Sequence, residues 1–257
     1  MILRRLGNKK KIAKEIQKYF PEHKIYIEPF FGAGGMFFNK PKAKYNIVND
    51  LDSDVFNLFQ VVMNQKEELE RAFYLMPIHS DLLNYWKQNK ETDPIKKALR
   101  FLFLSNFTYM GKMDCIKWSA RNEKEIFYKK IDLCFEYFYG CRFNNCDFKK
   151  FLNDLQINET DIKTKDTFIY SDPPYLQTVD TYSDSNSFKE SDSFELFEAL
   201  EKTGCKFAYS EFNHPFILQQ AKERNLNVNI IGERQNLKNR RTEILVTNYE
   251  NNQLKLF

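Results

Sequence analysis

The sequence is poor in the residues from which metal sites and disulfide frameworks are built. It has 257 residues but only three histidines and five cysteines, with no C-x-x-C pair and no H-E-x-x-H. An odd number of unpaired cysteines argues against a disulfide framework and against a zinc knuckle. So few histidines leave a catalytic metal little to bind. We therefore expect neither disulfides nor a metal.

Long apolar runs are also lacking. The stretch from Ala98 to Phe107 contains Arg100 and falls well short of the roughly 20 residues that span a bilayer. The segment from Met1 to Lys18 is too basic for a signal peptide. Glycine and proline number eight each, against 25 phenylalanines and 14 tyrosines, which is typical of a globular chain. We expect a globular, cytoplasmic protein that does not enter a membrane.

Positive charge exceeds negative charge by four, and it is concentrated in two places. The clusters are Lys9, Lys10, Lys11, Lys14 and Lys18 near the start, and Arg234, Lys238, Arg240 and Arg241 near the end. Such clusters can bind phosphate backbones, although solvated surface side chains explain them equally well. The charge pattern therefore permits nucleic-acid binding without requiring it.

A strand-like segment ends in "SDPPY", where a carboxylate meets two prolines. Proline has no amide N–H and a fixed φ, so Pro173 and Pro174 end the ladder and the predicted strand is Thr167 to Ser171. Asp172 then lies at the carboxyl end of a strand, where open α/β sheets bind their ligands. An ordinary Asp-Pro turn would look the same, so the rest of the chain must decide.

A glycine-rich turn occurs much earlier in the chain. In "KIYIEPFFGAGG" a short strand, Lys24 to Ile27, leads into three glycines, and "YNIVND" predicts a second strand ending at Asp50. This order opens a nucleotide-binding α/β unit, with Asp50 placed to accept from ribose hydroxyls. The third glycine of G-x-G-x-x-G is lacking, which favours a nucleoside without phosphates over a pyrophosphate.

The hydrophobic period then predicts helices between further strands. One helix is expected from Ser53 to about Met76. A second begins at the capping residue Thr92 or Asp93, with Pro94 in its first turn, and a third runs from Phe194 to Thr203. At least six strands alternate with helices, which indicates an α/β fold.

The spacing of the two sites predicts an insertion. Asp172 lies 140 positions after Gly32, whereas an uninterrupted doubly wound sheet needs about 80 to 90 residues between its first and fourth strands. The irregular region from Phe73 to Phe135 holds the surplus. The predicted fold is a doubly wound, mostly parallel Rossmann-like sheet with an inserted, largely helical subdomain.

Taken together, "EPFFGAGG" and "SDPPY" resemble the amino-group DNA methyltransferases, and their order resembles the Dam-like DNA adenine methyltransferases. The likeness covers nearly the whole chain, through "LGNKKKIAKEI", "NDLDSDVFNLF", "FLFLSNFTYMG" and "NRRTEILVTNY". It implies a Rossmann-like methyltransferase domain at 1-55 and 141-257 and a target-recognition subdomain at 56-140.

The resemblance also implies S-adenosylmethionine as the cofactor and S-adenosylhomocysteine as the product. The positions carried over to the cofactor are Gly7, Lys9, Glu28, Phe30, Gly32, Gly34, Asp50, Leu51, Asp147, Phe148 and Asp172. Asp147-Phe148 matches the acidic-aromatic pair that holds the cofactor's adenine. Plain core packing would account for the two phenylalanines as well. Arg5 stands where the family usually has an aromatic residue, so one cofactor contact is expected to differ.

Asp172, Pro173, Pro174 and Tyr175 are the expected catalytic residues. Adenine's amine is a poor nucleophile that is hidden in the duplex, so the base must be flipped out. Asp172 and the carbonyl of Pro173 can each accept one amine N–H and aim the nitrogen lone pair at the methyl group. Tyr175 would stack on the extruded base. The second proline makes that carbonyl rigid.

A mixture of basic, aromatic and amide side chains in the insertion is expected to contact DNA. The expected residues are Asn106, Tyr109, Lys112, Asp114, Lys117 and Arg121, with Lys238 and Arg240 from the late loop. A solvated hairpin is an equally good interpretation of any one of them. Asp114 stands near the place where GATC-reading members carry arginine, and it cannot replace a bidentate arginine on guanine. GATC is therefore a doubtful target.

The sequence thus predicts a site-specific methyltransferase acting on adenine N6 in double-stranded DNA, possessing no metal and no membrane segment. A cognate restriction endonuclease is a possible partner, and the chain is expected to act as a monomer or weak dimer. Two alternatives stay open: methylation of RNA or another amine at the same site, and a catalytically silent DNA-binding relative.

Overall fold

The computed structural model describes residues 2–3, 8–109, 115–117, 123–176, 188–235 and 240–250. By internal contacts the chain divides into two compact units. The helical unit comprises Met1–Lys10, Gly32–Asn39 and Asp50–Cys141, and the sheet unit comprises Lys11–Phe31, Lys40–Asn49 and Arg142–Phe257. The glycine turn and the N-terminal segment therefore group with the helices, whereas we expected them in the catalytic domain. The expected boundary near residue 140 lies one residue from the end of the helical unit.

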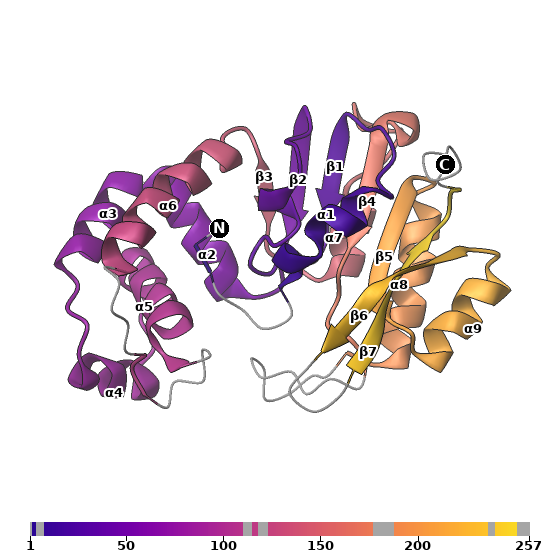
Figure 1. Cartoon of the computed structure of the whole chain (residues 1–257). Coiled ribbons are helices and arrows are strands. Elements are labelled where there is room, and N and C mark those ends of the chain that lie inside the picture. Colours follow the sequence, from indigo (N-terminus) through magenta and orange to yellow (C-terminus); the bar gives the residue numbers. More distant parts are fainter. Residues whose placement is uncertain are drawn as a thin grey trace. The chain divides into compact units, whose positions relative to one another are not determined.

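Within the described part of the chain, the sheet has seven strands in the order β3-β2-β1-β4-β5-β7-β6 (Figure 1). The strands are β1 (Ile25–Glu28), β2 (Tyr45–Asn49), β3 (Arg142–Asn144), β4 (Thr167–Ser171), β5 (Lys206–Phe212), β6 (Asn227–Gln235) and β7 (Arg240–Thr247). Strands β1 to β5 pair in parallel, and β7 is antiparallel to both β5 and β6. The predicted doubly wound, mostly parallel α/β sheet is confirmed, including the bounds of β4. The parallel strands end at one edge of the sheet, which is the ligand edge of such folds.

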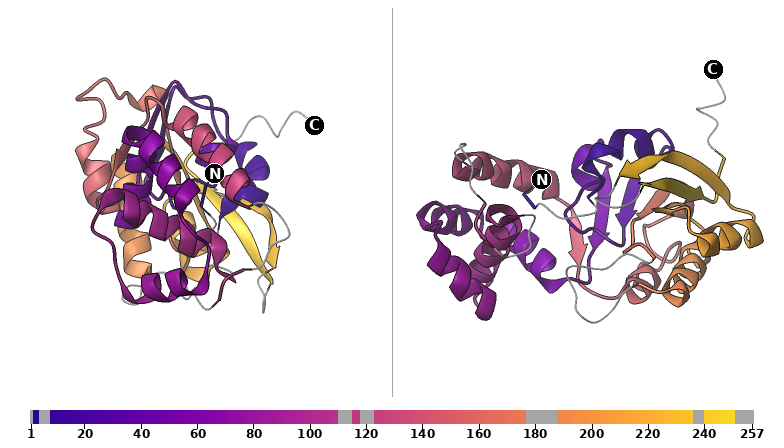
Figure 2. Two further views of the ribbon diagram at one scale, coloured as in Figure 1. Left: turned by 90° about the vertical axis from the view of Figure 1, so that its left-hand side faces the viewer. Right: turned by 60° about the horizontal axis from the view of Figure 1, so that its bottom comes forward.

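Helices cover both faces of this sheet (Figures 1 and 2). The helices and 3-10 turns of the sheet unit are α1 (Ala13–Gln17), α7 (Phe148–Asp154), η4 (Thr164–Asp166), α8 (Glu190–Lys202) and α9 (Pro215–Glu223). Buried residues of α7, α8 and α9 pack in one cluster with Ile27, Ile169 and Phe207. On the other face Phe20, just after α1, lies 4.6 Å from the ring of Phe168. All five residues of β4 are buried, as a central strand covered on both sides requires.

The helical unit has the expected helical content, with different bounds. It contains η1 (Lys9–Lys11), η2 (Phe37–Asn39), α2 (Ser53–Asn64), α3 (Lys66–Leu75), α4 (Ser80–Gln88), α5 (Pro94–Phe107) and α6 (Glu123–Phe138). The single helix expected to reach Met76 is two, because Gln65 leaves helical geometry with φ −140° and ψ 41°. Helix α5 begins as predicted, with Asp93 accepting from the amide of Lys96 at 2.9 Å.

Helix α6 was not predicted, because polar and aromatic residues interrupt its pattern. Its buried positions are Phe127, Ile131, Cys134 and Phe138, which follow the i, i+4, i+7 spacing of one helix face. None of the described helices meets the length and hydropathy needed to cross a membrane.

Candidate active site

The glycine turn after β1 is held by the acid that follows β2. Gly32 and Gly34 have φ of 54° and 70°, a left-handed conformation that favours glycine. The amide of Gly32 donates to Oδ2 of Asp50 at 2.5 Å, and Oδ1 of Asp50 accepts from the amide of Asp52 at 2.8 Å. A carboxylate accepts up to about four hydrogen bonds, so holding the turn is compatible with the expected ribose contact. A Cβ added at Gly32 would meet nothing within 4 Å.

The N-terminal segment passes directly against this turn. A Cβ placed on Gly35 would lie 2.4 Å from Oδ1 of Asn8 and 2.9 Å from the amide nitrogen of Lys9, so glycine is required here for close approach rather than for φ. Lys9 is only 2% exposed. A buried lysine beside the glycine turn fits its expected place near the cofactor. Gly7 lies outside the described residues, as does Arg5.

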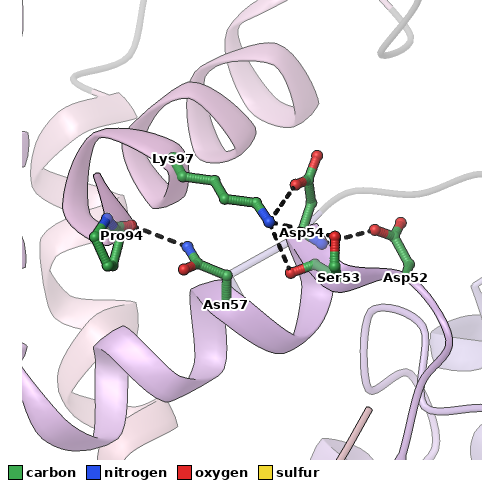
Figure 3. Close-up of polar contacts among 6 residues, drawn as sticks. All are labelled: Asp52, Ser53, Asp54, Asn57, Pro94 and Lys97. Atoms are coloured by element: carbon green, nitrogen blue, oxygen red, sulfur yellow. Dashed lines mark hydrogen bonds and ion pairs between the residues drawn. The ribbon is translucent and has the colours of Figure 1, made fainter. Parts of the chain in front are cut away.

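Helix α2 begins immediately after the Asp50 segment, and its first turn is tied to α5 (Figure 3). Nζ of Lys97 donates to Oγ of Ser53 and pairs with Oδ1 of Asp54, both at 3.2 Å. Nδ2 of Asn57 donates to the carbonyl of Pro94 at 2.9 Å. The start of α5 is therefore fixed to the helix that follows the acid. The other end of α5 leads into the loop expected to contact DNA.

Three aromatic rings meet at the carboxyl edge of the sheet unit. The ring centroids of Phe30 and Phe148 are 5.4 Å apart, and the ring of Phe188 lies 6.0 Å from the first and 6.2 Å from the second. Asp147 is exposed and caps α7 by accepting from the amide of Lys149 at 2.9 Å. The expected pair Phe30 and Phe148 is thus brought together. Phe188 was missed because it lies outside both the glycine turn and the Asp-Pro-Pro-Tyr motif.

Asn49, the last residue of β2, is a further residue that sequence reasoning missed. Its Nδ2 donates to the carbonyls of Pro29 at 3.0 Å and Cys146 at 2.9 Å, and its Oδ1 accepts from the amide of Cys146 at 3.2 Å. It is 1% exposed. The exits of β1 and β3 are therefore connected through one amide side chain. A buried asparagine directly before the strand-end acid was the available signal.

Glu28 and Leu51, both expected at the cofactor, differ in their burial. Glu28 is buried and accepts from the phenol of Tyr26 at 2.8 Å. Leu51 is 70% exposed.

Asp172 leaves β4 partly exposed, between a buried Ser171 and a buried Pro173. Burial raises the pKa of Tyr170 well above its usual value, and the charge of Asp172 raises it further. Burial likewise raises the pKa of Tyr26 and Tyr209, with smaller contributions from the charge of Asp172. The carboxylate therefore lies among phenols that stay protonated.

Tyr175 turns its phenol into the protein. Its hydroxyl donates to Oε1 of Glu243 and lies 3.1 Å from Oγ of Ser210. Its ring meets that of Phe212 edge to face, with centroids 4.6 Å apart. Burial raises the pKa of Tyr175 well above its usual value, and the charges of Asp172 and Glu243 raise it further. With 9% of its surface exposed, the residue has its hydroxyl committed inward.

The residues expected to contact DNA are placed differently from one another. Asn106 is 1% exposed, and its Nδ2 donates to the carbonyls of Ile2 and Leu102, each at 3.0 Å. A structural role therefore replaces the contact we expected of it, because a buried amide does not reach DNA. Tyr109 is 58% exposed, and Lys117 is partly exposed. Lys112, Asp114, Arg121 and Lys238 lie outside the described residues, as does the side chain of Arg240.

Tyr109 and Lys117 flank the ends of one loop. Thr108 and Ile116 form an antiparallel bridge. The amide of Tyr109 donates to the carbonyl of Cys115 at 3.0 Å, and the amide of Lys117 donates to that of Phe107 at 2.7 Å. Residues 107–109 at the end of α5 are therefore hydrogen-bonded to residues 115–117.

A cavity of about 690 Å³ lies at the opposite edge of the sheet, before β1, β2 and β4. Two of its cations are committed: Lys24 pairs with Asp166 at 2.8 Å, and Lys40 donates to the carbonyl of Pro41 at 3.0 Å. Because its lining comes from the amino ends of the strands, this cavity is separate from Asp172.

Comparisons with known proteins agree with the resemblance found in the sequence. Residues 6–243 match the family model of the D12 class N6 adenine-specific DNA methyltransferases. A DNA adenine methylase of Haemophilus influenzae is 30% identical over 189 residues, which are 66% of this chain and 61% of that protein. The "Type II methyltransferase M1.LlaDCHI" of Lactococcus lactis subsp. cremoris is 24% identical over 95% of this chain and 94% of its own length.

Among solved structures, the rRNA methyltransferase aviRa of Streptomyces viridochromogenes is 10% identical with a TM-score of 0.38, covering 92% of this chain and 83% of that one. The family match spans most of the chain, and it includes both the glycine turn and Asp172-Pro173-Pro174-Tyr175. The resemblance drawn from the sequence is confirmed: the chain belongs to the D12 class of N6 adenine-specific DNA methyltransferases.

Proposed function

We propose that this chain methylates N6 of an adenine flipped out of double-stranded DNA, at one short recognition sequence, with S-adenosylmethionine as donor. The observation that carries the proposal is Asp172, held partly exposed at the carboxyl end of β4 between buried neighbours. Family membership supplies the reaction class. The roles of individual residues are inferred from their contacts.

Each of the two units has residues that fit the proposed cofactor. The left-handed Gly32 leaves open space where any other residue would place a Cβ, so a ligand can approach the backbone there. Asp50 follows β2 and suits a ribose, while Phe30 and Phe148 offer aromatic surface for an adenine. When bound, the cofactor supplies a methyl group on a sulfonium.

In the proposed reaction, Asp172 and the carbonyl of Pro173 accept the two N–H groups of the adenine amine. These bonds draw the nitrogen towards a pyramidal geometry and aim its lone pair at the methyl carbon. The cofactor would supply the methyl group, giving up its bond to sulfur as the bond to nitrogen forms, and Asp172, hydrogen-bonded to the amine, would accept the proton that the amine loses. No covalent enzyme intermediate is needed.

Residues 110–114, which follow α5, are proposed to read the recognition sequence. The pairing of Tyr109 with Cys115 on either side of them and the 58% exposure of Tyr109 support this. Lys112, Asp114, Lys117, Arg121, Lys238 and Arg240 remain candidates for DNA contacts, and the helical region 56-140 remains the proposed target-recognition part. A restriction endonuclease as partner, a monomeric or weakly dimeric state, a cytoplasmic location and the absence of a metal also stay predictions.

The experiment is single-molecule sequencing of genomic DNA from cells that express the intact chain or Asp172→Ala, beside the exposed control Asp161→Ala. We expect N6-methyladenine at one motif with the intact chain and the control. Asp172→Ala should reduce methylation by at least about a hundredfold, the usual cost of removing a preorganised polar group that stabilises the transition state. Its affinity for the cofactor should stay nearly normal. Near-normal methylation by Asp172→Ala would contradict its role. Cofactor binding without any methylated adenine would turn attention to RNA.

A further inference from the structure

A buried polar cluster joins Tyr175, the tyrosine of Asp-Pro-Pro-Tyr, to strands β5 and β7. Tyr175 donates to Oε1 of Glu243, and Oγ of Ser210 donates to the same oxygen at 2.9 Å. Ser210 and Glu243 are 0% and 1% exposed. The buried cluster therefore joins β5, β7 and the exit of β4.

The sheet register explains why these groups meet. Alternate residues of a strand share a face, so Ser210 and Phe212 of β5 point the same way. Phe212 pairs with Glu243 across the antiparallel ladder, and directly paired residues lie on the same face. The phenol of Tyr175 is thus surrounded by Ser210, Phe212 and Glu243 because of register alone. If the register of β7 shifted by one residue, the carboxylate of Glu243 would point to the other face of the sheet and would not reach Tyr175.

On the opposite face of β5, Glu211 binds the backbone of Leu176, the residue that follows Tyr175. Glu211, at 0% exposure, accepts from the amide of Leu176 at 3.1 Å and from that of Phe212 at 2.8 Å. The chain after the two prolines is therefore held by a side-chain anchor on one face of β5 and by a backbone anchor on the other.

Burying two carboxylates costs free energy, so we interpret them as groups that fix the geometry of the segment they bind. A carboxylate that leaves water loses its hydration, and fold stability alone is served as well by apolar residues of similar volume. Two fully buried carboxylates converge here on two consecutive residues, Tyr175 and Leu176. Hydrogen bonds to a charged acceptor are short and directional, which suits the orientation of a ring.

We propose that Glu243 and Ser210 are positioning residues for the Tyr175 ring, fixing it for stacking on the flipped adenine, while Glu211 fixes the backbone beyond it. This inference rests on the proposed function, because it takes base stacking by Tyr175 as given. None of the three residues is expected to touch the base. They act by removing the freedom of the ring before DNA binds, so that stacking does not require the ring to be ordered at that moment.

The test uses the full chain and two duplexes that carry the motif found by sequencing: one has 2-aminopurine in place of the target adenine and reports flipping, and the other keeps the adenine and reports methylation. The variants are Glu243→Leu, which removes the acceptor, Glu243→Gln, which keeps an acceptor oxygen, and Ser210→Ala, which is milder. Glu198→Leu on the exposed side of α8 is the matched control. Each is measured for cofactor affinity, flipping fluorescence, kcat and KM for DNA.

We expect Glu243→Leu to bind the cofactor as the parent does but to lose flipping fluorescence and roughly tenfold in kcat, the order of one charge-assisted hydrogen bond. Glu243→Gln should restore most of that loss. In a double-mutant cycle, adding Tyr175→Phe to Glu243→Leu should cause no further loss, because both variants remove the same bond.

Three outcomes would overturn the inference: parent-like flipping and kcat in Glu243→Leu, losses that multiply in the cycle, or a loss of cofactor affinity that parallels the loss of kcat in Ser210→Ala as well. The third would indicate a general structural role. Methylation by the parent chain is measured in the same series. If the parent methylates adenine while the Glu243 variants match it, only the positioning role fails, and if the parent does not methylate adenine, the proposed function itself fails.

Discussion

The amide of Gly32 donates to Oδ2 of Asp50 over 2.5 Å, so the turn after β1 is closed by the residue after β2. The two residues are 18 positions apart in sequence and belong to the exits of neighbouring parallel strands. The acid expected to accept from a ribose therefore has a second task, which is to hold the glycine turn in place.

Asp50→Ala should weaken both folding and cofactor binding. Loss of a bond to a charged, partly buried acceptor is expected to cost about 1 to 3 kcal/mol of unfolding free energy, and cofactor affinity should fall because turn and ribose acceptor are lost together. Asp50→Asn keeps an acceptor and should retain more stability than affinity. Urea unfolding and calorimetric titration would check this, with Asp161→Ala as control. Unchanged affinity in Asp50→Ala would show that the carboxylate serves only the turn.

Lys97→Met should loosen α5 from the start of α2. The side chains of Lys97 and Asp54 are 26% and 33% exposed, so solvent screening limits the expected loss to about 1 kcal/mol or less. Lys96→Met, on the exposed side of the same helix, is the matched control and should change little. Thermal unfolding of both variants, and of Asp54→Ala with and without Lys97→Met, would measure the pair. Additive losses in that cycle would mean that the two groups do not interact.

Folding stability should fall on acidification because of His23. Burial lowers the pKa of His23 below its usual 6.5, with the carbonyl of Pro21 opposing the shift and the charge of Lys40 adding to it. The unfolded chain then binds the proton more readily, so this contribution is complete above pH 6.5 and is lost as pH falls towards the folded-state pKa. His23→Gln should flatten the slope of unfolding free energy against pH in that window. An unchanged slope would assign the dependence to other groups.

Cys115 offers a chemical test of the proposal that residues 110–114 read the DNA sequence. It is exposed and directly follows that segment, whereas Cys134 and Cys205 are buried. Burial raises the pKa of each buried thiol to about 11, so both should resist alkylation at neutral pH. Peptide mass mapping should show rapid labelling of Cys115, slowed by duplexes that carry the recognition motif. Equal protection by unrelated duplexes, or no protection, would contradict sequence reading by residues 110–114.

Much of the fold could be predicted because local signals agreed. Pro173 and Pro174 end β4 at the residue expected from their missing amide hydrogens, and Asp93-Pro94 begins α5 as capping chemistry predicts. The apolar spacing of α6 is present in the sequence and was missed among polar and aromatic residues, whereas the break at Gln65 was not predictable, because it depends on which side chains find a packed neighbour. The role of Asn106 escaped for the same reason, since an amide near a polar loop and an amide buried against Ile2 have the same sequence context.

The sequence by itself determined the reaction class and the place of the acid. Asp172 follows a strand-like segment that two prolines end, because prolines cannot continue the ladder, and the three glycines predict a tight turn after the strand before them. Only the tertiary structure decided which residues hold these groups. Glu243 reaches Tyr175, and Asp50 reaches Gly32, because pairings between distant strands set their register. Such pairings are fixed by long-range packing rather than by local residue chemistry.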